Sequence, residues 1–365
     1  MKKKTLRTAA LAAVFVLVAG AVWLLATRPR PVDFSALPPA AETGEIWLYG
    51  EQHASAPVME RELALWREHY GNGLRDLFVE LPYYTAEYLN LWMRADDDTI
   101  LDALYDDWEG TAIHQNGEVL KFYRAIKQDC PETVFHGTDV GHQYDTTGRR
   151  YLDDLEARGE GDSEAAARAR EAIEQGKRYY SKRGGDAAYR ENRMVENFAR
   201  EFDSLHGVDV MGVYGAAHTQ RSASTQHVRS LPNMAHQLAG RYGARLHTED
   251  LSGLAKRTEP IREDELTVGG KTYRASYFGE ENISAVFPKY QSRAFWRLED
   301  AYDDLKGSRR TGDKLPCANY PMRVSAGEAF LIEYTLADGS LMQKVYLADG
   351  TSWQGQESTV EIVVK

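Results

Sequence analysis

The stretch IWLYGEQHASAPVMERELALW, from Ile46 to Trp66, contains the two patterns that decide the fold. Its first residues form an apolar run that ends at Gly50, as expected for a strand that is buried on both faces. Its second half places apolar residues at helical spacing. Glu51 and His53 lie between the two, and a hydrophobic core accepts such groups only when each has a partner. The stretch therefore predicts a strand–helix unit with a carboxylate and an imidazole at its junction.

The same alternation continues along the chain. Apolar runs typical of buried strands follow at residues 74–81, 133–140 and 208–215, and a fifth strand is expected at residues 244–251, with amphipathic helical segments between them. This order predicts an α/β fold, with a mostly parallel central sheet flanked by helices.

The pattern changes from about Glu259. Polar and apolar residues then alternate around Gly-Gly and Asp-Gly turns, which is typical of β-hairpins. We therefore predict an α/β domain over residues 45–258 and a β-rich C-terminal extension over residues 259–365. The pattern does not show whether the extension is a separate domain or a set of edge strands.

The amino terminus has the composition of a membrane anchor. A basic tail (residues 1–7) precedes an uncharged apolar run from Thr8 to Thr27, and a Pro-rich linker follows at residues 28–44. A helix of this length rises about 30 Å, the thickness of the hydrocarbon core of a bilayer. More basic residues precede the run than follow it closely, which predicts a single-pass cell-membrane protein with its C-terminal domain extracytoplasmic. A cleaved signal peptide is the alternative.

The charge balance narrows the range of partners. The chain has a formal net charge of −11. Because all six charged side chains in the first thirty residues are basic, the rest of the chain is more acidic still. Such a domain repels phosphate backbones, and we expect no nucleic-acid partner. Cys130 and Cys317 could form a disulfide outside the cytoplasm, but their spacing neither shows this nor resembles a metal-binding signature.

Four of the predicted strands end in ionisable groups. These groups are Glu51 with His53, Glu80, Asp139 and His218. Because parallel strands bring their carboxyl ends to one edge of a sheet, we expect these side chains to line one cleft. An imidazole oriented by a carboxylate can deprotonate water, and a second imidazole or an arginine can stabilise the resulting oxyanion. The same set could instead bind one divalent metal. A serine nucleophile is not indicated, since there is no Gly-x-Ser-x-Gly turn.

The order of the motifs resembles the erythromycin-esterase-like family, within a wider grouping that includes Tiki/TraB-type and ChaN-like haem-binding proteins. The matching segments are GEQH (50–53), FVEL (78–81), Trp108, NGEVLKFYRAI (116–126), FHGTDV (135–140), YRENRMVENF (189–198) and GAAH (215–218). The resemblance implies an α/β hydrolytic site with His53 as general base and Glu80 as its acidic partner. It also implies that His218 and Arg193 hold or polarise the substrate.

These observations together predict an extracytoplasmic hydrolase that cleaves an ester or amide of a small molecule or peptide. The candidate catalytic residues are His53, Glu51, Glu80, His218, Asp139 and Arg193. The Tiki/TraB resemblance allows one divalent metal (Mn, Co or Zn), with His53, Glu80 and His218 as its ligands. The ChaN-like resemblance gives the alternative function, a haem- or iron-binding protein.

Overall fold

The computed structural model describes residues 30–364, except residues 115–116, 222–230, 285–286 and 354–355. The anchor predicted for Thr8 to Thr27 lies outside these residues. No helix within the described ranges is both long and apolar enough to cross a membrane. The chain divides after Ser252 into two compact units.

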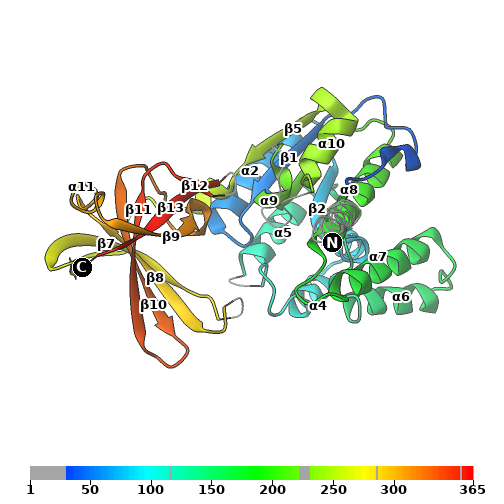
Figure 1. Ribbon diagram of the computed structural model, residues 1–365. Coiled ribbons are helices and arrows are strands. Elements are labelled where there is room, and N and C mark those ends of the chain that lie inside the picture. Colours follow the sequence, from blue (N-terminus) through cyan, green and yellow to red (C-terminus); the bar gives the residue numbers. More distant parts are fainter. Residues whose placement is uncertain (1–29, 115–116, 222–230, 285–286, 354–355, 365) are drawn as a thin grey trace, which may run out of the picture. The chain divides into compact units, whose positions relative to one another are not determined.

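The first unit is built on a five-stranded parallel sheet (Figure 1). Its strands are β1 (Ile46–Glu51), β2 (Asp76–Pro82), β3 (Val134–Asp139), β4 (Val210–Gly215) and β5 (Leu246–Asp250). They lie in the order β3-β2-β4-β1-β5, and every neighbouring pair is parallel. The predicted α/β fold with a parallel sheet is confirmed for this unit. All five carboxyl ends consequently lie at the same edge of the sheet.

Helices connect and cover these strands. Their bounds are α2 (Ala56–Gly71), α3 (Tyr83–Met93), α4 (Thr99–Asp107), α5 (Glu118–Asp129), α6 (Thr147–Ala157), α7 (Glu164–Tyr180), α8 (Ala187–Ser204), α9 (Ala216–Thr219) and α10 (Met234–Tyr242), with short 3₁₀ turns η1 (Phe34–Ala36) and η2 (Gly243–Arg245). The helix predicted after β1 begins at Ala56, with Pro57 in its first turn, where the missing N–H of proline is not needed.

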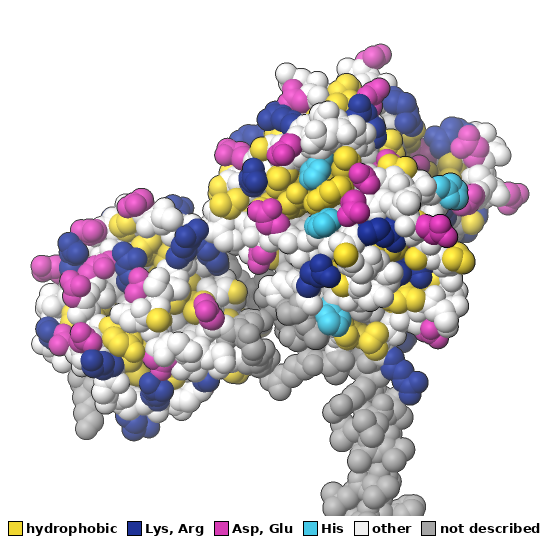
Figure 2. All heavy atoms as spheres, turned by 90° about the horizontal axis from the view of Figure 1, so that it is seen from above, with side chains coloured by type: hydrophobic (Ala, Val, Ile, Leu, Met, Phe, Trp, Pro, Cys, Tyr) yellow, Lys and Arg dark blue, Asp and Glu magenta, His cyan; other side chains and the backbone are white. Residues whose placement is uncertain are grey.

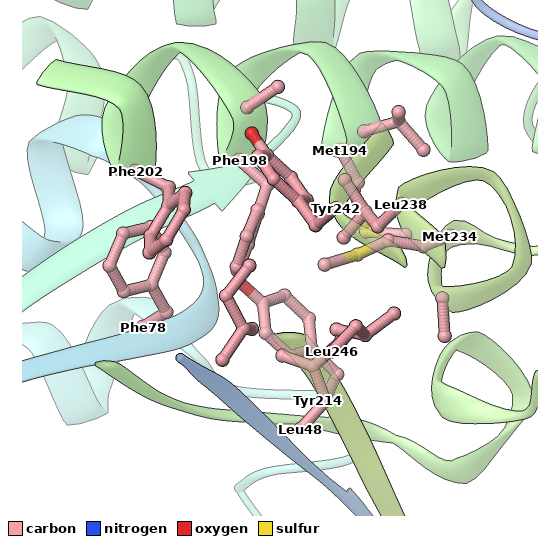
Figure 3. Close-up of a cluster of buried hydrophobic side chains, with 14 of the residues drawn as sticks. Leu48, Phe78, Met194, Phe198, Phe202, Tyr214, Met234, Leu238, Tyr242 and Leu246 are labelled. Carbon is pink, nitrogen blue, oxygen red and sulfur yellow. The ribbon is translucent and has the colours of Figure 1, made fainter. Parts of the chain in front are cut away.

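One face of the sheet packs against α8 and α10 (Figure 3). The buried cluster there consists mainly of Leu48, Phe78, Met194, Phe198, Phe202, Tyr214, Met234, Leu238, Tyr242 and Leu246. Each large side chain of this kind contributes about 1.5–3 kcal/mol when it is buried. Successive strand residues point to opposite faces, so Val79, which follows Phe78, lines a cavity on the other face with Met59 of α2 and Phe122 of α5. Both faces of the sheet are therefore covered.

The connections that follow β1 and β4, two neighbouring strands at the centre of this sheet, run over opposite faces. β1 leads into α2 on one face, whereas β4 leads through α9 towards α10 on the opposite face. Because β1 and β4 are neighbours, the connections after them diverge at the carboxyl edge. In open parallel sheets such a point is where ligands bind.

The second unit is an antiparallel sheet, as the hairpin pattern predicted. Its strands are β6 (Arg262–Val268), β7 (Lys271–Asn282), β8 (Tyr290–Leu298), β9 (Arg309–Pro316), β10 (Glu328–Leu336), β11 (Leu341–Ala348), β12 (Ser352–Trp353) and β13 (Gln356–Val363), with η3 (Ser252–Ala255), α11 (Tyr302–Leu305) and η4 (Cys317–Asn319) as short helical turns. The strand order is β12-β13-β11-β10-β8-β7-β6, and β9 pairs with β13. Gly269 and Gly270 form the β6–β7 turn with positive φ angles, which explains the Gly-Gly pair. Both cysteines carry free thiols.

Candidate functional site

The turn after β1 brings an imidazole to the carboxyl edge of the sheet. Nδ1 of His53 lies 2.7 Å from Oε1 of Glu51, and the histidine side chain is 31% exposed. Ala54 has a φ of 53°, a left-handed conformation that is uncommon outside glycine and often found at functional sites. Gly215 lies directly under the imidazole, since a Cβ there would be 3.3 Å from Nε2 of His53. The glycine at the end of β4 thus permits this close approach.

The side chain of Glu80, near the end of β2, is only 6% exposed. It accepts hydrogen bonds from the backbone N–H of Gly215 (2.5 Å) and from Nη2 of Arg190, and Nε2 of His218 lies 3.5 Å from its Oε1. Burial alone would raise the pKa of Glu80, but the positive charges of His218, Arg190 and His53 lower it to about 2. This carboxylate is therefore ionised at neutral pH.

Asp139, at the end of β3, is held by the same arginine. Nε of Arg190 donates to Oδ1 at 2.9 Å and Nη2 donates to Oδ2 at 2.6 Å, a two-pronged contact typical of Arg–carboxylate pairs. Nε2 of His142 lies 3.0 Å from Oδ2, and the N–H of Val140 donates to Oδ1 at 2.7 Å. Burial opposes ionisation of Asp139, but Arg190 and His142 hold its pKa well below the usual range.

His218 follows β4 in the short helix α9 and is also oriented by a carboxylate. Its Nδ1 lies 2.8 Å from Oε2 of Glu191, whose other oxygen accepts from the N–H of Met234 at 2.5 Å. Its Nε2 lies 3.4 Å from Nη1 of Arg190. Burial lowers the pKa of His218, but the charges of Glu80 and Glu191 outweigh burial and raise the pKa overall. The Glu191 contact directs Nε2 towards the cluster.

The pKa of His53 determines whether its imidazole can act as a base. Burial lowers its pKa, but the charge and hydrogen bond of Glu51, together with the charge of Glu80, raise the pKa to about 9. The imidazole is consequently protonated at neutral pH in the resting protein. It can act as a base only after it loses that proton.

Five of the six candidate catalytic residues lie together at this edge. They are Glu51, His53, Glu80, Asp139 and His218. The structure places Arg193 apart from them, with its guanidinium 2.5 Å from Glu196 on the same helix. The arginine that contacts the carboxylates is Arg190, three residues earlier in α8. Sequence reasoning missed Arg190 and its neighbour Glu191.

A cavity of about 260 Å³ opens beside this cluster. Its lining includes His53, Glu80, Asp139, Arg190, His142, Trp108, Tyr179 and Tyr180. The combination of aromatic walls with a few convergent polar groups is typical of small-molecule sites, although the volume lies slightly below their usual range.

The charges on the visible surface are mixed. On the face shown in Figure 2, acidic and basic side chains are interspersed, and histidines lie among acidic and hydrophobic neighbours. Such a face presents both signs of charge and not one continuous field.

A second buried histidine, His136, lies within β3, three residues before its end. Its Nε2 is 2.8 Å from Asp76 and its Nδ1 is 2.9 Å from Glu201, while its ring stacks on Phe78 at 4.7 Å. Burial lowers the pKa of His136, but these two carboxylates raise it to about 9. We interpret this ion triad as structural, since it does not line the cavity beside the cluster.

The donor set does not fit the predicted metal centre. Within the described ranges, no group of three or more His, Cys, Asp or Glu side chains is arranged to hold a metal ion. Both oxygens of Glu80 are engaged by Arg190 and by the N–H of Gly215. A divalent cation bound to Glu80 and His218 would therefore lie against a guanidinium group.

Comparisons with known proteins give three structural similarities. No protein-family model matches the chain, and no curated protein matches it. A mutant of the erythromycin esterase EreC in its open conformation is similar, with 11% identity, a TM-score of 0.44 and coverage of 92% of each chain. A protein from Bacillus cereus has 14% identity and a TM-score of 0.41, over 75% of this chain and 82% of that one. A succinoglycan biosynthesis protein has 12% identity and a TM-score of 0.41, over 68% and 75%.

An erythromycin esterase is thus among the structural neighbours. Similarity at these identities and TM-scores does not establish an activity, and the function must be sought in the site itself.

Proposed function

We propose that this chain is a hydrolase of the erythromycin-esterase-like type, which cleaves an ester or amide with water activated by His53. The observation that supports the proposal is the meeting of three strand ends, those of β1, β2 and β3, at one cavity. There the Glu51–His53 pair lies next to Glu80, which shares Arg190 with Asp139. Perturbed ionisable groups that converge on one cavity are the usual mark of acid–base catalysis.

The contacts suggest a role for each group. With its Nδ1 directed to Glu51, neutral His53 presents Nε2 to accept a proton from water. The water oxygen then bonds to the substrate carbonyl carbon, and Arg190, which also lines the cavity, stabilises the oxyanion that forms. Collapse of this intermediate breaks the bond to the leaving group, and the proton on His53 passes to that group. Glu51 stabilises the imidazolium between these two steps.

A panel of chromogenic esters and amides tests this proposal. We expect His53→Ala to lower kcat/KM by about 10²–10⁴-fold, the usual contribution of a general base. The matched control is His247→Ala, because His247 also pairs with a glutamate (Glu45, 2.7 Å) but is 47% exposed and lies outside the cluster. Thermal unfolding of both variants shows that each has folded. Equal turnover by the His53→Ala variant and the wild type would refute the assignment.

The same preparation addresses the alternatives predicted from the sequence. Loss of turnover after dialysis against a chelator would show that a metal is required and would contradict the metal-free mechanism. A Soret absorption band on adding haem, with no ester or amide cleaved, would replace the hydrolase with the haem-binding function.

We also propose that the apolar run from Thr8 to Thr27 holds the domain outside the cytoplasm at the cell membrane. The length of the run and the charges around it support this. Deletion of residues 1–29 should move the protein from the membrane fraction to the soluble fraction. Retention in the membrane fraction after the deletion would contradict the proposal.

A further inference from the structure

Helix α2 buries a carboxyl group that has no partner among the described residues. The side chain of Glu62 has an exposure of 0%, and neither of its oxygens has a hydrogen-bond partner. It lies on the buried stripe of α2, between Met59 and Leu65, where an apolar residue would pack against the sheet. An unpaired buried polar group costs several kcal/mol, so its presence requires an explanation.

Glu62 lines a small cavity beneath the Glu51–His53 pair. The cavity has a volume of about 50 Å³, whereas one water molecule needs only about 10–15 Å³. Glu51, His53 and Glu80 form its polar wall, and the remaining lining is apolar or aromatic. It shares His53 and Glu80 with the 260 Å³ cavity, so the two cavities meet at the candidate catalytic residues.

The lining of this cavity has more carboxyl groups than cationic side chains. Three carboxyl groups, those of Glu51, Glu62 and Glu80, surround the cavity, and His53 is the only cationic side chain among the described residues that line it. Burial, together with the charge of Glu51, raises the pKa of Glu62 well above its usual range. Glu62 is therefore protonated while the cavity holds no cation, and a cation placed beside it would favour its ionised form.

The shape and the walls of the cavity narrow the class of cation. The lining beside the carboxyl groups includes Val79, Val119, Phe122 and Tyr123, which suit aliphatic carbon and not a fully hydrated ion. The described residues also offer no cluster arranged to coordinate a metal. A small alkylammonium group matches both halves of the lining, since it combines a charged donor with an apolar stem.

We propose that this cavity is a subsite for the primary ammonium end of a ligand, with Glu62 as the residue that determines specificity. The inference rests on the proposed function in that the amine would belong to the substrate, an ester or amide with a short aminoalkyl arm. On binding, the ammonium ion keeps its three protons and donates to Glu62, whose own proton leaves to solvent. One proton is therefore released for each ligand bound at neutral pH.

Ethylammonium chloride is the probe, because its binding can be measured without turnover. Calorimetry in two buffers of different ionisation enthalpy should show saturable binding to the wild type, with release of about one proton. Glu62→Gln and Glu62→Met should each bind about tenfold more weakly or worse, since a charge-assisted hydrogen bond is lost. Both variants should remain folded, because neither side chain brings a charge into the core. No saturable binding by the wild type, or equal binding by the two variants, would overturn the proposal.

A second measurement separates this inference from the proposed hydrolysis. Two esters that differ only in a terminal amine or methyl group should be cleaved at different rates by the wild type, and Glu62→Gln should abolish the preference for the amine. Ethylammonium binding without any ester cleavage would retain the subsite and reject the hydrolase. Cleavage without ethylammonium binding or amine preference would reject the subsite alone.

Discussion

The protonation state of His53 makes a quantitative prediction about the proposed reaction. With a pKa of about 9, only about 1% of this imidazole is neutral at pH 7. If neutral His53 is the general base, kcat/KM should rise about tenfold for each pH unit up to about pH 8, reach half its maximum near pH 9 and level off near pH 10. Replacement of Glu51 by Gln removes the charge and the charged hydrogen-bond acceptor that chiefly raise this pKa. The inflection of the Glu51→Gln profile should therefore lie about one pH unit or more below that of the wild type.

The assay is hydrolysis of a chromogenic ester between pH 5.5 and pH 10, combined with an NMR titration of His53 itself. Glu45→Gln is the matched control, since Glu45 also contacts a histidine (His247, 2.7 Å) but that pair is exposed. Its profile should coincide with that of the wild type. An NMR pKa of His53 at or below 6.5 would refute the electrostatic reasoning. A profile that is flat from pH 6 to pH 9.5 would refute the role of His53 as a base.

Three further predictions concern the surroundings of the site. His136→Asn should lower the free energy of unfolding in urea by about 3 kcal/mol more at pH 6 than at pH 10. The raised pKa of His136 stabilises the fold fully below pH 6.5, and this stabilisation is lost as the pH rises through about 9. A loss of stability that does not depend on pH would contradict this reasoning. Gly176→Ala should destabilise the fold by about 1–3 kcal/mol, since its Cβ would lie 1.9 Å from a backbone oxygen of the segment after β3. Gly240→Ala is the control, because a Cβ there meets open space. Equal melting temperatures of the two variants would argue against close packing of α7. Arg190→Lys should lower kcat/KM by about a hundredfold while Arg193→Lys leaves it nearly unchanged, and the reverse order would return the catalytic role to Arg193.

The strands of the first unit, and with them most of the cluster, could be predicted from the sequence. The predicted runs at residues 74–81 and 208–215 correspond to β2 at Asp76–Pro82 and β4 at Val210–Gly215. Strands buried on both faces are mostly apolar, so their ends are visible where ionisable residues gather. Parallel pairing then brings those ends to one edge, which is why Glu51 and Glu80 could be placed together without coordinates.

The arginine of the cluster could not be chosen from strand ends, because it comes from a helix. Arg190 and Arg193 both lie near the start of α8, and only the rotation of that helix about its axis decides which one reaches Asp139. The signal that could have identified Arg190 is its spacing from the core. It precedes Met194 by four residues and Phe198 by eight, which places it on the buried stripe, whereas Arg193 is displaced from that stripe.

Glu62 also lies on the buried stripe of a helix, on the opposite face of the sheet from Arg190. It lies three residues from Met59 and three from Leu65, so an ionisable side chain again interrupts the apolar stripe of a helix. The two interruptions differ in their partners, since Arg190 contacts two carboxylates whereas neither oxygen of Glu62 has a hydrogen-bond partner among the described residues. A packed core can hold such a group only when a partner satisfies it or when it is kept neutral. The paired arginine therefore helps to build the site, and the unpaired acid marks the place where a ligand would complete it.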